Sequence, residues 1–121
     1  MRSSEQLTVD ICPGVREGQR IYKLSGPLTI TTLFDFQTAV RAEKSPSVIL
    51  DLCQVSYIDS AGVGAVVNAH IVCAKTGKQF AIVGMSDRVR TLFQMTRVDK
   101  MLPIFTTIDE AEKAFTKPGA A

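Results

Sequence analysis

The most constraining feature of this sequence is a nearly continuous apolar run at residues 47–53, Ser-Val-Ile-Leu-Asp-Leu-Cys. Such a run is typical of a strand that is covered on both faces inside a sheet. A second apolar run, Phe-Ala-Ile-Val, occupies residues 80–83. Between the two runs, apolar residues recur at helical spacing, namely Val63, Val66, Val67, Ile71 and Ala74. Gly77 is placed to end this helix, so the region predicts a strand–helix–strand unit of a parallel sheet.

Two earlier segments, residues 7–11 and 20–25, alternate apolar and polar side chains. They predict half-buried strands that pair as an antiparallel hairpin. Gly26-Pro27 is expected to stop the second strand. Thr32 and Asp35 are spaced as a variant capping box, which predicts that a helix begins there. This helix should turn one apolar face inward: Leu33, Phe36 and Val40.

The segments after residue 83 continue the alternation. Ser86 or Asp87 can cap a helix, and residues 104–105 predict a short last strand. Thr107 and Glu110 form a capping box for a C-terminal helix. The side chains expected to face inward on these two helices are Val89, Leu92 and Phe93, then Ala111, Ala114 and Phe115.

The predicted order is therefore β-β-α-β-α-β-α-β-α. It indicates a single α/β domain with an opening hairpin and a mostly parallel central sheet of four to five strands, packed with about four helices. We expect the domain to span residues 1–117. Residues 118–121 are expected to form a flexible tail.

Composition excludes several classes of function. Fourteen basic and twelve acidic residues leave a net charge of +2 without a basic block, which argues against nucleic acid or a membrane surface as partner. The sequence predicts no membrane span and no signal peptide, so a cytoplasmic location is expected. Cys12, Cys53 and Cys73 form no CxxC pair and are expected to act as small hydrophobic residues. We expect no metal and no cofactor.

The loop after the first buried strand, residues 54–64, holds the candidate chemistry. Ser60 stands at the predicted helix start beside Asp59, and Gly62 and Gly64 follow it. The serine can cap the helix by accepting a backbone N–H. The glycines can either ease packing or let another molecule approach the backbone closely. A simple cap does not need two glycines that each cost roughly 1 kcal/mol, which hints at a function.

Residues 51–64, from Asp51-Leu52 to Asp59-Ser60-Ala61-Gly62-Val63-Gly64, closely resemble the signature of the STAS domain, specifically of the anti-sigma factor antagonist family. The resemblance continues through residues 80–84, 89–96 and 102–105 and covers essentially the whole chain. It implies a switch protein rather than an enzyme. The resemblance implies that a protein serine kinase, itself the anti-sigma factor or a related switch kinase, phosphorylates Ser60 and that a serine phosphatase resets it. The implied partner-binding residues are Asp59, Ser60, Ala61, Gly62, Val63 and Gly64.

Two other functions of such a domain stay open. The chain can instead be a STAS module of a larger assembly, such as a stressosome or a lipid-transport complex, or a nucleotide- or lipid-binding sensor. A homodimer is also compatible with the sequence.

The sequence departs from the family pattern at two positions. Thr29 stands where the family often has aspartate. The missing aspartate puts in doubt any partner or nucleotide contact that the family makes at this position. Arg97 stands where the family favours a glycine at a helix end. That position suits a left-handed backbone, so we expect a positive φ angle at Arg97.

Three enzyme-like or signalling alternatives fail on particular residues. A serine hydrolase elbow would need glycine at Ile58, and His70 lies ten residues along the helix, about 15 Å from Ser60. A phosphate-binding loop ending at Gly77-Lys78 would need a hydroxyl residue where Gln79 stands. A phosphotransfer receiver would need an acidic pair after its first strand, where Asp10 stands alone. We expect His70 to be a packing residue.

Overall fold

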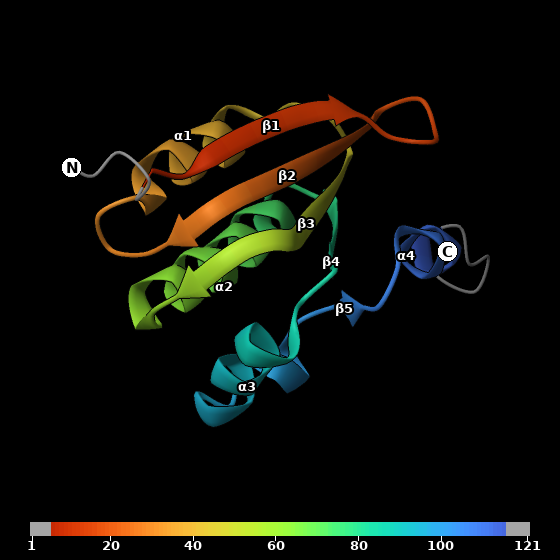
Figure 1. Ribbon diagram of the computed structural model, residues 1–121. Coiled ribbons are helices and arrows are strands. Elements are labelled where there is room, and N and C mark those ends of the chain that lie inside the picture. Colours follow the sequence, from red (N-terminus) through yellow and green to blue (C-terminus); the bar gives the residue numbers. More distant parts are fainter. Residues whose placement is uncertain (1–5, 116–121) are drawn as a thin grey trace.

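The computed structural model describes residues 6–115, and the boundary expected at residue 117 and the tail at 118–121 lie outside this range (Figure 1). The predicted order of strands and helices is confirmed, with one additional 3-10 turn. The elements are β1 (Thr8–Pro13), β2 (Gln19–Leu28), α1 (Leu33–Ala42), β3 (Ser47–Ile58), α2 (Ser60–Lys75), β4 (Gln79–Val83), α3 (Asp87–Met95), η2 (Asp99–Met101), β5 (Ile104–Phe105) and α4 (Ile108–Phe115).

The five strands form one sheet in the order β1-β2-β3-β4-β5. β1 runs antiparallel to β2, and every later pair is parallel, as the sequence predicts. Ile21 of β2 pairs with Ile49 of β3, and Ile49 pairs with Ala81 of β4, so these three residues lie side by side across the centre of the sheet. Because β2 to β5 run in one direction, their carboxyl ends meet at one edge of the sheet, where loops lead into α1, α2, α3 and α4.

Helices α1, α2 and α3 cover one face of the sheet, and α4 covers part of the other. The main core lies between the sheet and the first three helices, and it includes Leu24, Leu50, Val66 and Phe93, whose side chains are fully buried. A smaller cluster joins α4 to the opposite face through Ile21, Ile49, Ala81, Val83 and Ala111. None of the helices in the described part of the chain is long and apolar enough to span a bilayer.

The expected end of the second strand was wrong. β2 continues through Gly26-Pro27 to Leu28, which pairs with Ile58 at the end of a correspondingly longer β3. Gly26 adopts a φ of +99°, and the register shifts between Gly26 and Pro27, so the strand absorbs the turn-forming residues as an irregularity. Beyond Ser25 the strand has no β1 partner, and proline is tolerated at such an edge.

Capping differs from the sequence expectation at α1. The Thr32 side chain makes no capping bond to this helix; its Oγ1 accepts from the Thr29 backbone N–H at 2.8 Å and donates to the Pro27 carbonyl at 2.8 Å. At α3, the Ser86 hydroxyl is the cap and accepts from the Val89 N–H.

The α4 capping box forms with a one-residue offset. Thr107 Oγ1 accepts from the Glu110 N–H, while the Glu110 carboxylate accepts from the Thr106 N–H. In α4, Ala111 is buried and Phe115 is half-buried, whereas Ala114 is exposed, contrary to expectation.

The expected inward face of α2 and the expected burial of the cysteines also differ from the structure. Ile71 is 42% exposed and Ala74 is exposed, whereas Ala65, Ala69 and Cys73 are buried. Apolar residues occur on every side of α2, so its periodicity alone does not select the face that packs closest to the sheet. Cys12 is half-buried, but Cys53 is exposed rather than a core residue.

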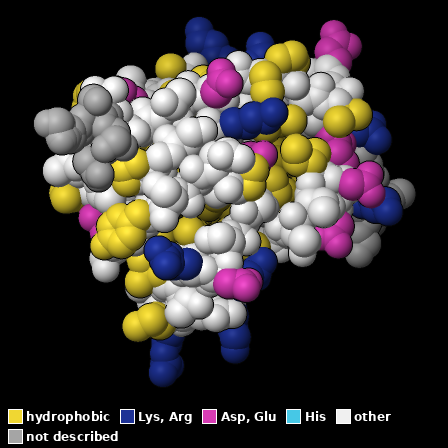
Figure 2. Space-filling model, in the orientation of Figure 1, with side chains coloured by type: hydrophobic (Ala, Val, Ile, Leu, Met, Phe, Trp, Pro, Cys, Tyr) yellow, Lys and Arg dark blue, Asp and Glu magenta, His cyan; other side chains and the backbone are white. Residues whose placement is uncertain are grey.

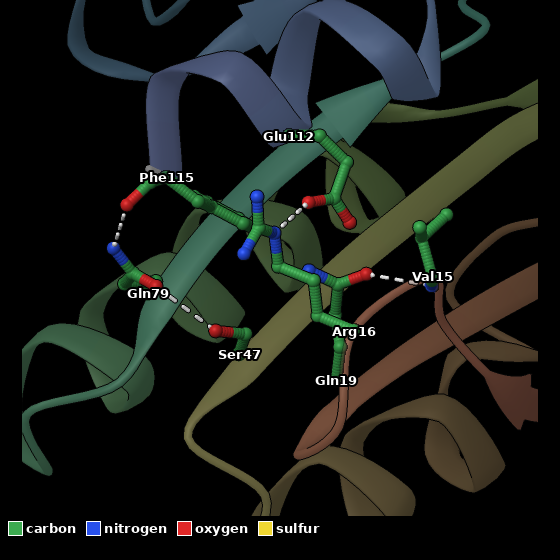
Figure 3. Close-up of polar contacts among 7 residues, drawn as sticks. All are labelled: Val15, Arg16, Gln19, Ser47, Gln79, Glu112 and Phe115. Carbon is green, nitrogen blue, oxygen red and sulfur yellow. Dashed lines mark hydrogen bonds and ion pairs between the residues drawn. The ribbon is translucent and has the colours of Figure 1, made fainter. Parts of the chain in front are cut away.

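The amino-terminal edge of the sheet is closed by polar contacts (Figure 3). Arg16, in the turn after β1, forms an ion pair with Glu112 of α4 at 3.1 Å. The Gln79 side chain accepts from the Ser47 hydroxyl at 2.9 Å and donates to the Phe115 carbonyl at 3.1 Å. These contacts fasten α4 and the β1–β2 turn to the edge opposite the candidate loop.

Candidate functional site

Ser60 is the first residue of α2 and lies at the carboxyl edge of the sheet, directly after β3. It is exposed, and among residues 6–115 its hydroxyl has no hydrogen-bond partner. A serine in this position can be reached by another protein, and no internal contact has to break first.

Asp59, and not Ser60, caps α2. Its Oδ1 accepts from the Gly62 N–H at 2.8 Å, and its Oδ2 accepts from the Ile30 N–H at 3.2 Å. One carboxylate therefore caps the helix and also holds the loop between β2 and α1. The sequence expectation that Ser60 serves as the cap was wrong, and the correction leaves the Ser60 hydroxyl unused.

The two glycines of the loop have different surroundings. A Cβ atom on Gly62 would lie 2.2 Å from the Leu28 carbonyl oxygen and 2.7 Å from Ile58 Cγ1. A Cβ on Gly64 would meet nothing within 4 Å, and Gly64 is exposed. Gly62 is thus required by the close approach of α2 to the end of β2, whereas Gly64 leaves an open surface beside Ser60.

The six residues expected to bind a partner differ in exposure. Ser60 and Gly64 are exposed, Asp59 and Ala61 are half-buried, and Gly62 and Val63 are buried. The exposed part of this loop is therefore small, so a partner that touches Ser60 would also contact neighbouring elements.

Exposed apolar side chains lie near Ser60. Tyr57, which is 53% exposed, and Met95, which is 72% exposed, line one hollow together with Ser60. Ile30, in the turn before α1, is 68% exposed, and its N–H donates to Asp59, the residue before Ser60. We call these three residues the apolar rim. Figure 2 shows hydrophobic side chains at the left and lower left of the molecule, where β2, β3 and α3 meet this edge. The sequence signals that could have found the rim were Ile30 in a threonine-rich turn and Met95 on the polar side of its helix.

A hollow of about 370 Å³ lies between the start of α2 and α3. Its lining combines apolar side chains with one carboxylate, three hydroxyls and one guanidinium: Tyr57, Ile58, Asp59, Ser60, Arg88, Thr91, Leu92 and Met95. Arg88 is the only cation in this lining, and the sequence offered no motif that would have singled it out.

The described residues do not assemble a catalytic or metal-binding group around Ser60. His70 packs against Phe80, with ring centroids 5.8 Å apart, as expected for a packing residue. Three or more metal-ligating side chains do not come together anywhere in residues 6–115. The Cys53 thiol lies on β3, where partial desolvation and the neighbouring Asp51 carboxylate raise its pKa and so disfavour the reactive thiolate.

Comparison with known proteins assigns the family. The sequence profile of the STAS domain matches residues 9–111. The chain belongs to the STAS domain family. An anti-sigma-B factor antagonist of Staphylococcus aureus is 28% identical over 85 residues, which are 68% of this chain and 79% of that protein.

Two solved structures share the STAS fold. An anti-sigma factor antagonist from Mycobacterium paratuberculosis superposes with a TM-score of 0.80 at 21% identity, covering 94% of this chain and 97% of that one. The Bacillus cell fate determinant SpoIIAA in its phosphorylated form gives a TM-score of 0.65 at 18% identity, covering 89% and 99%. At these identities the likeness concerns the fold alone.

Both departures of this STAS domain from the family pattern are visible in the structure. Arg97 has a φ of +63°, which confirms the predicted left-handed backbone. Thr29 places a hydroxyl 3.1 Å from that of Thr31, and its backbone N–H donates to Thr32. The carboxylate that contacts this loop is that of Asp59, through the Ile30 N–H.

Proposed function

We propose that this STAS domain is a cytoplasmic anti-sigma factor antagonist that works as a phosphorylation switch. The unmodified form binds a serine-kinase anti-sigma factor, and phosphorylation of Ser60 releases it. The observation that carries this proposal is the exposed, unengaged Ser60 hydroxyl beside the apolar rim. The name of the Staphylococcus aureus relative and the phosphorylated form of SpoIIAA support it.

In this proposal the chain supplies the acceptor and the kinase supplies the catalysis. Ser60 Oγ attacks the γ-phosphorus of ATP, a new O–P bond forms, the bond to ADP breaks, and the hydroxyl proton passes to a base of the kinase. Asp59 is poorly placed to be that base, because both of its oxygens already accept backbone N–H groups. A serine phosphatase would hydrolyse the phosphate ester and restore the hydroxyl.

The rim explains why a phosphate would weaken binding. Phosphorylation adds about −1.5 to −2 charges at pH 7. Placed among Ile30, Tyr57 and Met95, this charge would have to lose its hydration when a partner covers the rim. The Asp59 carboxylate next to it adds repulsion toward any acidic group of the partner.

The test compares three variants at one position. The cognate serine kinase with ATP should place one phosphate on Ser60, and Ser60→Ala should abolish it. Calorimetry should show that Ser60→Ala binds the kinase like the wild type, since Asp59 still caps the helix, whereas Ser60→Asp and Ser60→Glu bind at least about tenfold more weakly.

Two results would overturn the proposal. One is equal affinity of all three variants; the other is phosphate on Ser56 or Ser86 instead of Ser60. A stable high-mass assembly that forms without regard to Ser60 would favour the alternative of a STAS module in a larger complex, and a retained small ligand would favour a sensor.

A further inference from the structure

The hollow between α2 and α3 brings the proposed phosphorylation site and a cation together. Ser60, in the first turn of α2, and Arg88, in the first turn of α3, both line it. These helices follow β3 and β4, which are adjacent parallel strands, so both helix starts lie at the same edge of the sheet. The two side chains are therefore neighbours across one space, although they are 28 positions apart in the sequence.

Arg88 is available for a new contact. Among residues 6–115 it forms no ion pair, and its guanidinium makes no side-chain hydrogen bond. Asp59 is the one carboxylate of the same lining, and its two oxygens are occupied by the N–H groups of Gly62 and Ile30. A guanidinium without a fixed anionic partner is well suited to a phosphate, which it can bind in a bidentate manner.

We propose that Arg88 binds the phosphate on Ser60 across this hollow, so that the phosphorylated domain gains an ion pair between α2 and α3. The inference rests on the proposed phosphorylation of Ser60 and adds the internal partner of that phosphate. A hollow of about 370 Å³ has room for the group and for water, each molecule of which takes roughly 30 Å³ in the liquid.

The ion pair would change the surface in two ways. It neutralises part of the phosphate charge, and it draws a hydrated group over Leu92 and Met95 in the lining of the hollow. Phosphorylation would then remove a recess from the partner-binding edge in addition to adding charge. A kinase or phosphatase would meet Ser60 in two different settings, open before the reaction and paired with Arg88 after it.

The experiment places phosphoserine at position 60 during translation, so that no kinase is needed, and follows the ³¹P NMR signal of the full chain with pH. The second pKa of a free phosphoserine is about 6. Pairing with Arg88 should lower it, and Arg88→Gln should raise it again by about half a unit or more, a threefold change in proton affinity. Raising the salt concentration should reduce the difference, because both side chains are exposed and salt screens an exposed ion pair.

Arg90→Gln is the matched control. It removes the same charge from the same helix, but two positions along a helix turn the side chain about 200° away, and Arg90 is not part of the lining. Arg88→Lys keeps the charge without the bidentate geometry and should give an intermediate pKa. Equal titration of the wild type and Arg88→Gln would overturn the inference, and so would an equal shift in Arg90→Gln.

The outcome separates this inference from the proposed function. If the kinase phosphorylates Ser60 but Arg88→Gln leaves the phosphoserine titration unchanged, the phosphorylation switch is supported and the binding of the phosphate by Arg88 is excluded. If the kinase fails to modify Ser60, the proposed function falls, whatever the titration of the translated phosphoserine shows.

Discussion

Single residues at the carboxyl edge of the sheet are of two kinds, those with structural contacts and those exposed for a partner. Asp59 and Gly62 are structural: Asp59 accepts hydrogen bonds from two segments, and Gly62 lets α2 approach the Leu28 carbonyl. Ser60 and Gly64 are exposed and make no comparable contact. Substitutions within this short loop should therefore have opposite effects on stability.

The two glycines provide a matched pair for testing this division. Gly62→Ala should lower the free energy of unfolding by roughly 1–3 kcal/mol, because its Cβ would press on backbone atoms that cannot move easily. Gly64→Ala should raise it by about 0.5–1 kcal/mol, because alanine favours a helix and nothing lies within 4 Å. Urea denaturation measures both values. Equal effects of the two substitutions would contradict the packing that we describe.

Arg97 is the one residue with a positive φ that is not glycine among those described. A side chain in this conformation costs roughly 1 kcal/mol, while glycine gains freedom in the unfolded chain that offsets part of the relief. Arg97→Gly should therefore be neutral or stabilising by up to about 1 kcal/mol in thermal denaturation. Arg97→Ala keeps the Cβ and should show no gain. A clear loss of stability in Arg97→Gly, absent in Arg97→Ala, would show that strain relief does not govern this corner.

Among the elements, α1 is tied to β2 by one buried tyrosine. The Tyr22 hydroxyl donates to Glu43 Oε1 at 2.6 Å and lies 3.2 Å from the Ala39 carbonyl, which it can also reach. Burial and the Glu43 carboxylate raise the pKa of Tyr22 well above its usual value. Burial alone would raise the pKa of Glu43, but the hydrogen bonds from Tyr22 and from the Ser45 N–H lower it below 4.5.

A lowered carboxyl pKa makes this contact stabilising above the unfolded-state pKa, and the stabilisation is lost as the pH falls through the folded-state pKa. Tyr22→Phe should therefore cost about 1–2 kcal/mol at pH 7 and less at pH 3. Glu43→Gln should likewise make stability less dependent on pH below about 5. Tyr57→Phe serves as the control, since Tyr57 is 53% exposed. Urea denaturation at the two pH values would contradict this if the cost of Tyr22→Phe were the same at both.

The elements also show what the sequence can predict. Their order followed from the apolar runs and helical spacings, because these patterns reflect burial that the topology preserves. The end of β2 could not be predicted in this way. Gly26 and Pro27 would end a strand that had no neighbour, but here β3 continues the pairing past both of them. Likewise, Asp59 and Ser60 are both good caps, and the bond from the Ile30 N–H to Asp59 comes from a distant loop that the local sequence does not reveal. Arg88 could not be identified because its neighbour Ser60 is adjacent only in space.

On the scale of the whole molecule, the two edges of the sheet differ in chemistry. The amino-terminal edge is closed by Arg16–Glu112 and by the bonds of Gln79 to Ser47 and Phe115 (Figure 3). The carboxyl edge carries the apolar rim beside a reachable hydroxyl. A domain arranged in this way should use one edge for stability and the other for its partner.

Two exposed aliphatic residues on opposite edges of the sheet test this division. Ile30 is 68% exposed in the rim, and Val15 is 77% exposed in the turn between β1 and β2. Both substitutions to serine should leave the free energy of unfolding within about 0.5 kcal/mol of the wild type, because neither side chain is buried. Ile30→Ser should weaken binding of the serine-kinase partner at least about fivefold, since loss of an interface residue that matters costs roughly 1 kcal/mol or more. Val15→Ser should bind like the wild type in the same calorimetric titration. If Val15→Ser lost affinity and Ile30→Ser did not, the partner would dock on the amino-terminal edge, and the rim beside Ser60 would need another explanation.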